Sequence, residues 1–187
     1  MRLFFAFTFE NQIKQKIYEN IKILQRYIPK GLKWVEKENL HITFRFLGET
    51  NPKIIDNLNE KIEICVKEFS SFSISFDNIE VIPNFHRPRL IWYKMIEESG
   101  ISKKIFQAIE TELSKLNFKK SNRPLKLHTT LGRIKYAKNQ DWQAILKNVK
   151  PISEKILCKE LTLFKSQLTS SGPIYSIVKK FPLSQNN

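Results

Sequence analysis

The sequence predicts an α+β protein built from two lobes. Strand-like and helix-like segments alternate along its 187 residues, and no linker or low-complexity stretch divides them. In each half, a strand, a helix and a strand that carries a His-x-Thr motif follow in this order, with the motifs at His41 and His128. We therefore expect two α+β lobes that face each other, with mixed or antiparallel sheets and with helices on the outer faces.

The first half of the chain opens with a buried strand. Residues 2–9 (RLFFAFTF) are rich in phenylalanine and end at polar residues. Isoleucine and leucine then recur at helical spacing over 13–28, until the sequence Pro-Lys-Gly at 29–31 stops the helix. A short strand at 33–35 and a polar turn lead into the strand that contains His41.

A second helix follows this strand. Asn51 is typical of a helix N-cap and Pro52 of the first helical position, and an apolar face continues to Phe69. The alternation of apolar and polar residues over 72–82 predicts a strand with one buried face. After a loop, residues 90–96 (LIWYKMI) predict another strand.

The second half repeats this alternation. We expect, in order, a helix at 101–116, a basic loop at 119–124, the strand of His128 within 125–134, a shorter helix at 141–149, and two strands at 156–168 and 173–183 joined by a turn. No tract among these elements separates one domain from another.

Composition limits the function only loosely. With 41% hydrophobic residues the chain is expected to fold. The net charge of +14 favours a polyanionic partner such as RNA or DNA, although a solvated lysine-rich surface explains it equally well. Cys65 and Cys158 lack C-x-x-C spacing, which favours free thiols in a reducing compartment. No segment reaches membrane-spanning length, and the opening apolar run is short for a signal peptide, so we expect a cytoplasmic protein.

Two of the three histidines stand in the same pattern, His41 with Thr43 and His128 with Thr130. On a strand, positions i and i+2 face the same side, so each motif presents an imidazole beside a hydroxyl. One such pair is more often structural, but two on facing strands can converge on one volume. Two imidazoles can flank a phosphodiester as base and acid, and the hydroxyls can donate to phosphate oxygens.

Arg133 follows Thr130 by three residues. On a regular strand it faces away from His128 and Thr130, but a bulge or bend at Gly132 would bring it to their side. Its guanidinium would then match phosphate oxygens. A plain surface charge is the alternative that spacing leaves open.

Other chemistries find less support. A catalytic zinc needs three protein ligands, and no third histidine or pair of acids lies near either motif. His86 lies in a basic loop and is expected to play no part. The chain has five glycines and neither a Gly-rich phosphate loop nor a G-x-S-x-G elbow. We expect neither a metal nor a cofactor.

Several segments together resemble a known family. They are the opening RLFFAF, NLHITFRFLGE, LIWY, SNRPLKLHTTLGRI and the closing LTLFKSQLTSSGPIYSIVKKFPL. On these the chain resembles the two-histidine phosphoesterase superfamily, and specifically the RNA 2′,3′-cyclic phosphodiesterases, also called 2′-5′ RNA ligases. One departure is Lys126-Leu127, where some relatives carry histidine or proline.

The resemblance implies a bilobal fold with a pseudo-two-fold axis and a V-shaped central cleft, formed by residues 1–187 as one domain. It implies metal-independent hydrolysis of a 2′,3′-cyclic phosphate at an RNA end, leaving a 2′-phosphate. His41 and His128 would be catalytic, with His128 activating water and His41 protonating the leaving 3′ oxygen. Thr43, Thr130 and Arg133 would bind the phosphate. The expected partner is RNA with a cyclic-phosphate end, and the protein is expected to be a monomer without a protein partner.

Two alternatives stay open at this point. A binding module for RNA or nucleotides could use the same fold without catalysis, and a ligase whose main task is joining RNA ends would share the same site. The base-binding residues also stay open. The aromatic candidates for stacking, most of them expected in the core, are Phe7, Trp34, Phe44, Phe46 and Tyr175.

Overall fold

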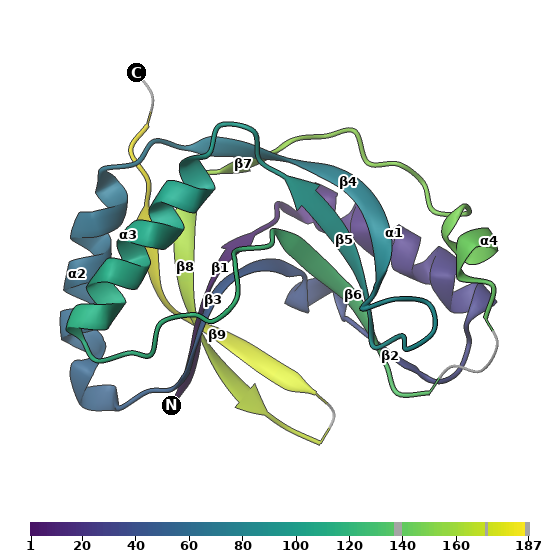
Figure 1. Cartoon of the computed structure of the whole chain (residues 1–187), viewed down its shortest axis with the longest axis horizontal. Coiled ribbons are helices and arrows are strands. Elements are labelled where there is room, and N and C mark those ends of the chain that lie inside the picture. The colour runs from purple at the N-terminus through teal and green to yellow at the C-terminus, as the bar shows by residue number, and fades with distance from the viewer. Residues whose placement is uncertain (137–139, 171, 186–187) are drawn as a thin grey trace.

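The computed structural model describes residues 1–136, 140–170 and 172–185, and the strands in these ranges form two sheets (Figure 1). The first sheet contains β1 (Arg2–Thr8), β3 (His41–Glu49), β8 (Glu160–Leu168) and β9 (Pro173–Pro182). The second contains β2 (Leu32–Trp34), β4 (Phe72–Ile82), β5 (Leu90–Ile96), β6 (His128–Ile134) and β7 (Ile156–Cys158). Their orders are β3-β1-β8-β9 and β2-β6-β5-β4-β7, and neighbouring strands pair antiparallel throughout the described residues.

The helices occupy the positions that the apolar spacing predicts. They are α1 (Asn11–Tyr27), α2 (Ile55–Lys67), α3 (Ile101–Lys115) and the short α4 (Trp142–Leu146), with 3₁₀ turns at Lys37–Asn39 and Pro52–Ile54. The predicted cap is confirmed, because the Asn51 side chain accepts a hydrogen bond from the Lys53 amide at 3.0 Å and Pro52 opens the turn that leads into α2.

The repeat expected from the sequence is confirmed in three dimensions. In the first sheet β1 pairs with β3, and α1 lies between them in sequence; in the second, β5 pairs with β6, and α3 lies between them. In each half, the motif strand therefore pairs with the strand that comes just before the helix: β3 with β1, and β6 with β5. The two halves are therefore related as copies, as the resemblance implies.

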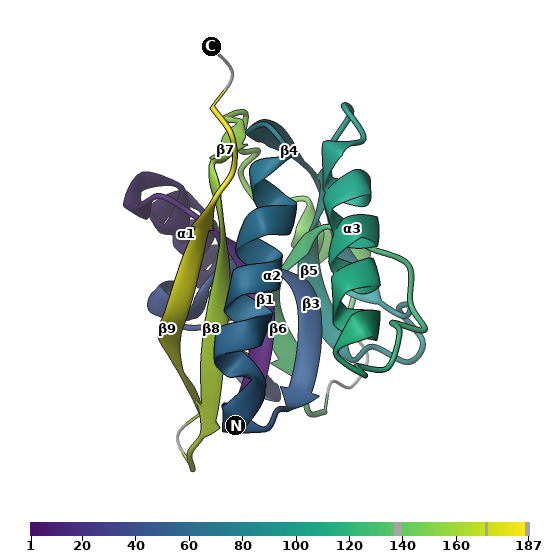
Figure 2. The ribbon, with the colours of Figure 1, turned by 90° about the vertical axis from the view of Figure 1, so that its left-hand side faces the viewer.

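Each helix of this repeat packs on the sheet of the other half. The buried Asn20 of α1 donates to the hydroxyl of Tyr93 on β5 at 2.9 Å. Phe106 of α3 meets Phe44 of β3 with ring centroids 5.7 Å apart, and α2 packs against both α3 and β9. Figures 1 and 2 show α2 and α3 side by side over the first sheet, with α1 on the other lobe. The helices cover the outside, and residues of both sheets line a hollow between them.

The segment 156–168 differs from the single strand that we predicted. It contains two strands, of which β7 pairs with β4 in the second sheet and β8 pairs with β1 in the first. The buried positions change parity between Cys158 and Leu161, so the chain turns its apolar face from one sheet to the other at Lys159. Shorter differences are that β6 begins at His128 and that α4 ends at Leu146.

The apolar core is shared by both sheets. One cluster of buried residues contains side chains of β1, β3, β5, β6 and β8, together with the inner faces of the helices. Cys158 is buried and Cys65 half-buried, and both are free thiols, as predicted. None of the described helices is long and apolar enough to cross a membrane. Ser171, within the predicted turn at 169–172, lies outside the described residues.

Candidate active site

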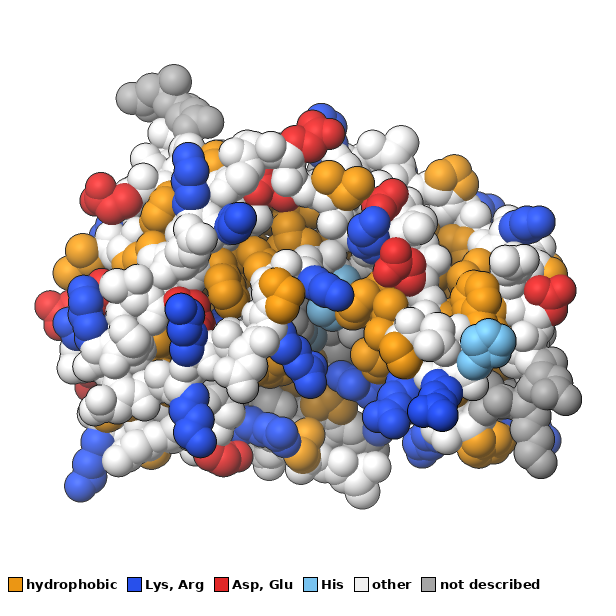
Figure 3. Space-filling view, viewed as in Figure 1, with side chains coloured by type: hydrophobic (Ala, Val, Ile, Leu, Met, Phe, Trp, Pro, Cys, Tyr) orange, Lys and Arg blue, Asp and Glu red, His pale blue; other side chains and the backbone are white. Residues whose placement is uncertain are grey.

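The two motif strands come from different sheets and meet across the cleft. Strands β3 and β6 approach each other, and a hollow of about 780 Å³ opens beside them. Of the five predicted site residues, four line this hollow: His41, Thr43, Thr130 and Arg133. His128 is two residues from Thr130 on β6, and its charge acts on His41. In Figure 3 a histidine side chain is visible inside a hollow at the centre of this face, with Lys and Arg side chains gathered below it.

An extra residue in each motif strand decides which side chains face the hollow. Between Thr43 and Arg45 the pairing of β3 with β1 skips Phe44, and between Thr130 and Gly132 the pairing of β6 with β5 skips Leu131. Such a bulge shifts the alternation by one position. Side chains at the first, third and sixth places of each motif strand therefore share one face.

The bulge brings Arg133 to the side of Thr130, as the sequence allowed. The extra residue is Leu131, however, and not Gly132. A glycine is needed at position 132 for a separate reason: a Cβ there would stand 2.9 Å from the ring of Trp34 on β2. The glycine lets β2 bring this aromatic ring against the motif strand, where Trp34 also lines the hollow.

The two imidazoles are held in matching ways. Nδ1 of His41 lies 2.7 Å from the carbonyl oxygen of Asn39, and Nδ1 of His128 lies 2.7 Å from that of Lys126. Because a carbonyl oxygen only accepts, each Nδ1 carries a proton and donates it. In the neutral ring, Nε2 is then the basic atom. Both histidines therefore have the same neutral tautomer, in which Nε2 can accept a proton.

The Nε2 atoms differ in their partners. His41 Nε2 lies 3.0 Å from the hydroxyl oxygen of Thr43, which donates to it when the ring is neutral. Nε2 of His128 has no hydrogen-bond partner among the described residues, and its ring packs on Trp92 with centroids 4.2 Å apart. Trp92 belongs to β5, beside β6. One imidazole is thus engaged by its own motif, while the other presents a free lone pair.

The pKa of His41 is lowered to about 4, mainly by burial; the hydrogen bond to the Asn39 carbonyl opposes this, and the charges of His128, Lys14 and Arg133 act in the same direction as burial. Burial also lowers the pKa of His128, and the charges of Lys126 and Arg133 act in the same direction. Both rings are therefore neutral near pH 7 in the free protein. The same positive surroundings favour an anionic ligand.

The structure separates the aromatic candidates. Phe7 and Phe44 are buried in the core. The other three, Trp34, Phe46 and Tyr175, line the hollow. Tyr175 of β9 stands edge-on to His41, with ring centroids 5.3 Å apart.

Not every residue near the motifs was foreseen from the sequence. The stacking of Trp92 on His128 was not predicted, because nothing in the segment LIWY shows that β5 and β6 are neighbours. His86 is exposed in the loop between β4 and β5 and lines neither hollow, as expected.

A sequence model of the family described as LigT like Phosphoesterase matches residues 8–92 and 99–175. The chain belongs to this family. Among curated proteins, it is 35% identical to an RNA 2′,3′-cyclic phosphodiesterase of Methanocaldococcus jannaschii, over 97% of this chain and 100% of that one. It is 32% identical to a protein of the same name from Archaeoglobus fulgidus, over 97% of this chain and 99% of the other.

Solved structures support the LigT-like fold. A protein of Thermus thermophilus superposes with a TM-score of 0.84 at 22% identity over 100% of both chains. E. coli LigT, crystallised as a complex with 3′-AMP, superposes with a TM-score of 0.79 at 22% identity over 98% of both chains. The predicted fold class, a bilobal two-histidine phosphoesterase of α+β type, is confirmed.

Proposed function

We propose that this LigT-like phosphoesterase hydrolyses the 2′,3′-cyclic phosphate at an RNA end to a 2′-phosphomonoester, using His41 and His128 as acid and base. The observation that carries the proposal is the pair of imidazoles from two sheets, each with Nδ1 bound to a carbonyl oxygen and Nε2 left for proton transfer. The names of the relatives support the same substrate.

The hydrogen bonds support a division of roles. Nε2 of His128 has a free lone pair that can accept the proton of the attacking water. The new P–O bond forms as the bond from phosphorus to the 3′ oxygen breaks. His41, protonated at Nε2, gives its proton to the departing 3′ oxygen. The product then has a 2′-phosphate and a 3′-hydroxyl.

Thr43 links this step to phosphate binding. While His41 is neutral, the Thr43 hydroxyl donates to Nε2. Once Nε2 carries a proton, it donates to Thr43, and the hydroxyl proton turns toward a phosphate oxygen. The phosphate charge in turn raises the low pKa of His41. Thr130 and Arg133 of β6 line the same hollow and supply donors from the opposite side.

The first test is hydrolysis itself. We expect the protein to convert an RNA ending in 2′,3′-cyclic phosphate to the 2′-phosphate, with phosphorus NMR identifying the isomer. Activity should persist in chelator, because the described residues include no group of three His, Cys, Asp or Glu side chains that could hold a metal ion. Loss of activity in EDTA with recovery on adding zinc or manganese would contradict this expectation. Tight RNA binding without any turnover would favour the non-catalytic binding module.

The pH profile tests the paired histidines. The profile of kcat/KM reports the free protein, where both pKa values lie below the usual 6.5, so we expect its bell-shaped maximum below pH 6.5. The bound phosphate monoanion favours the imidazolium, so the profile of kcat should lie at higher pH. Arg133→Gln removes a charge that lowers both pKa values and should shift the kcat/KM profile upward. Coincident profiles, unmoved by Arg133→Gln, would rule out this account.

We further propose that residues 1–187 act as one domain, as a monomer in the cytoplasm and without a protein partner. Two free thiols fit a reducing compartment, and the +14 charge suits an RNA substrate. The same groups can serve the joining of RNA ends through a 2′-5′ linkage, in which a 5′-hydroxyl replaces water as the nucleophile and the 3′ oxygen again leaves, so the substrates supplied decide which reaction predominates.

A further inference from the structure

Phe46 occupies a special position in the repeat. It stands five residues after His41, as Arg133 stands five after His128, and both follow the extra residue of their strands. Both side chains line the hollow. Where the second motif presents a guanidinium, the first presents a phenyl ring that is 61% exposed. An aromatic face in water at the rim of a site for RNA is a stacking surface without an occupant.

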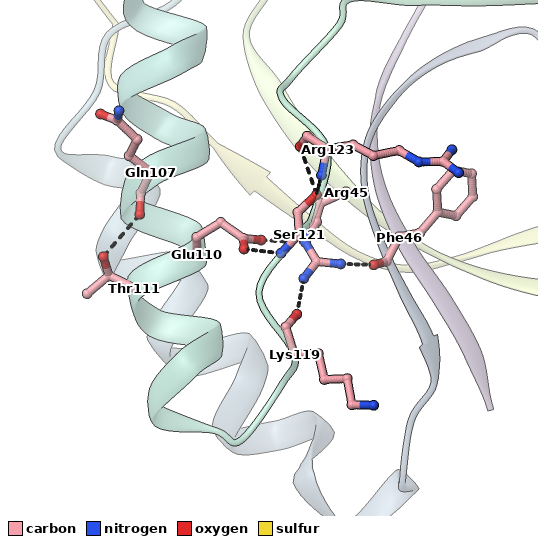
Figure 4. A network of polar contacts seen from close by, with 8 residues as sticks. All are labelled: Arg45, Phe46, Gln107, Glu110, Thr111, Lys119, Ser121 and Arg123. Atoms are coloured by element: carbon pink, nitrogen blue, oxygen red, sulfur yellow. Dashed lines mark hydrogen bonds and ion pairs between the residues drawn. The ribbon is translucent and has the colours of Figure 1, made fainter.

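The backbone that presents this ring is held firmly. The neighbouring Arg45 donates to the carbonyl oxygen of Phe46, to the carboxylate of Glu110 on α3, and to the carbonyl oxygen of Lys119 at 2.5 Å. The other oxygen of Glu110 accepts from the Ser121 amide at 2.7 Å. Figure 4 shows this network tying β3 to the loop that leads into β6. The backbone of Phe46 is therefore fixed relative to that loop.

The same loop carries Arg123. Its side chain extends from the loop toward Phe46 in Figure 4. Among the described residues its guanidinium makes no hydrogen bond or ion pair, and the same holds for the ammonium groups of Lys120 and Lys126. The loop that Arg45 ties to the backbone of Phe46 thus carries three cations without a partner among the described residues.

These three cations line a second hollow, of about 1230 Å³, between α3 and the loop. The acidic side chains of this hollow are already engaged. Glu110 pairs with Arg45, Glu97 accepts from the Ser102 amide and hydroxyl, and Glu80 accepts from the Trp92 indole. The donors to Glu97 and Glu80 are neutral, so these two carboxylates keep their charges, but five Lys and Arg side chains line the hollow against three Glu, which favours a phosphate backbone there.

The order of the rings away from His41 indicates which nucleotide meets Phe46. Phe4 and Tyr175 lie next to His41, with ring centroids 5.1 and 5.3 Å away, whereas Phe46 pairs with Phe4 at 5.7 Å and, among the described residues, makes no ring contact with His41 or Tyr175. Phe46 thus lies one ring further from His41 than Phe4 does. The terminal nucleoside has Tyr175 and Trp34 within the first hollow.

We propose that Phe46 stacks the base of the nucleotide that precedes the terminal one, and that Arg123 pairs with the phosphate joining the two. The upstream strand then continues into the second hollow, past Lys120 and Lys126. This inference rests on the proposed function and adds a preference for RNA chains over cyclic mononucleotides.

The test compares a dinucleotide that ends in 2′,3′-cyclic phosphate with the cyclic mononucleotide. We expect Phe46→Ala to lower the ratio of their kcat/KM values about tenfold, the usual worth of one base stacked on an aromatic ring, and Phe46→Trp to keep it. Arg123→Gln should lower the ratio as well, and should reduce the salt dependence of RNA binding by about one phosphate contact. Phe85→Ala and Arg87→Gln, exposed residues that line neither hollow, serve as matched controls with an unchanged ratio.

A dinucleotide without a base at the preceding position sharpens the test. The wild type should lose about as much activity on it as Phe46→Ala loses on the intact dinucleotide, and Phe46→Ala should not distinguish the two substrates. Equal losses of Phe46→Ala on mononucleotide and dinucleotide would assign the ring to the terminal base and overturn the inference, as would an unchanged ratio in both variants.

The readouts separate this inference from the proposed function. A wild type that fails to hydrolyse even the mononucleotide contradicts the function alone. The affinities of the 2′-phosphate products, measured for the same variants, then decide the role of Phe46 and Arg123.

Discussion

Replacing either motif histidine by alanine should lower turnover of a cyclic phosphate by about 10²–10⁴-fold, the usual contribution of a positioned general acid or base. In the proposed division of roles, His41→Ala removes the proton for the 3′ oxygen, and His128→Ala removes the acceptor for the proton of water. The double replacement should cost far less than the product of the two single effects, because the pair acts as a unit. Steady-state kinetics on a nucleoside 2′,3′-cyclic phosphate measures all three.

His86→Ala is the matched control, because this histidine is exposed and lines neither hollow. It should retain wild-type turnover, and Thr43→Ala and Thr130→Ala should lose less than the histidine variants. Circular dichroism establishes that each variant is folded. Near-normal hydrolysis by folded His41→Ala and His128→Ala would mean that the repeated motif is structural.

The second large effect concerns stability. The ion pair of Arg45 and Glu110 is largely removed from water, with side chains 12% and 8% exposed. Removing one partner leaves the other charge uncompensated, so Arg45→Ala or Glu110→Ala should lower the free energy of unfolding by about 3–5 kcal/mol. Urea unfolding monitored by circular dichroism gives this value directly.

The double variant Arg45→Met with Glu110→Leu distinguishes the loss of the ion pair itself from the cost of leaving one buried charge unpaired. Because it leaves no unpaired charge, it should be much more stable than the sum of the single losses implies. Lys67→Ala, which breaks the exposed pair with Glu63, is the control and should change stability by less than about 1 kcal/mol. Single variants as stable as the wild type would show that the Arg45 pair is as weak as one on the surface.

The proposed catalytic groups could be found from the sequence because they depend on residue type and on the two-residue spacing within a strand. His41 and Thr43, like His128 and Thr130, need no knowledge of tertiary structure to be placed side by side. The side on which Arg133 lies could not be settled in this way. It depends on the bulge at Leu131, which exists only through the pairing of β6 with β5.

It was harder to predict from the sequence which helices and sheets pack against each other. The apolar stripe of α1 predicts burial but does not say which sheet covers it, and Asn20 finds Tyr93 on the sheet of the other half. The buried ion pair of Arg45 was not predicted, since an arginine next to a motif is normally a surface charge. The break at Lys159 did leave a signal, because the apolar positions change parity there. That signal is readable only once two sheets are expected.

The position of β8 in the first sheet has a consequence for protein synthesis. Strand β1 lies between β3 and β8, and β8 follows both motif strands, β3 and β6, along the chain. Until it emerges, the sheet that carries His41 has an open edge, and an incomplete chain holds both histidines without the framework that aligns them. A nascent chain that has already exposed both motifs therefore still lacks the complete sheet that positions His41.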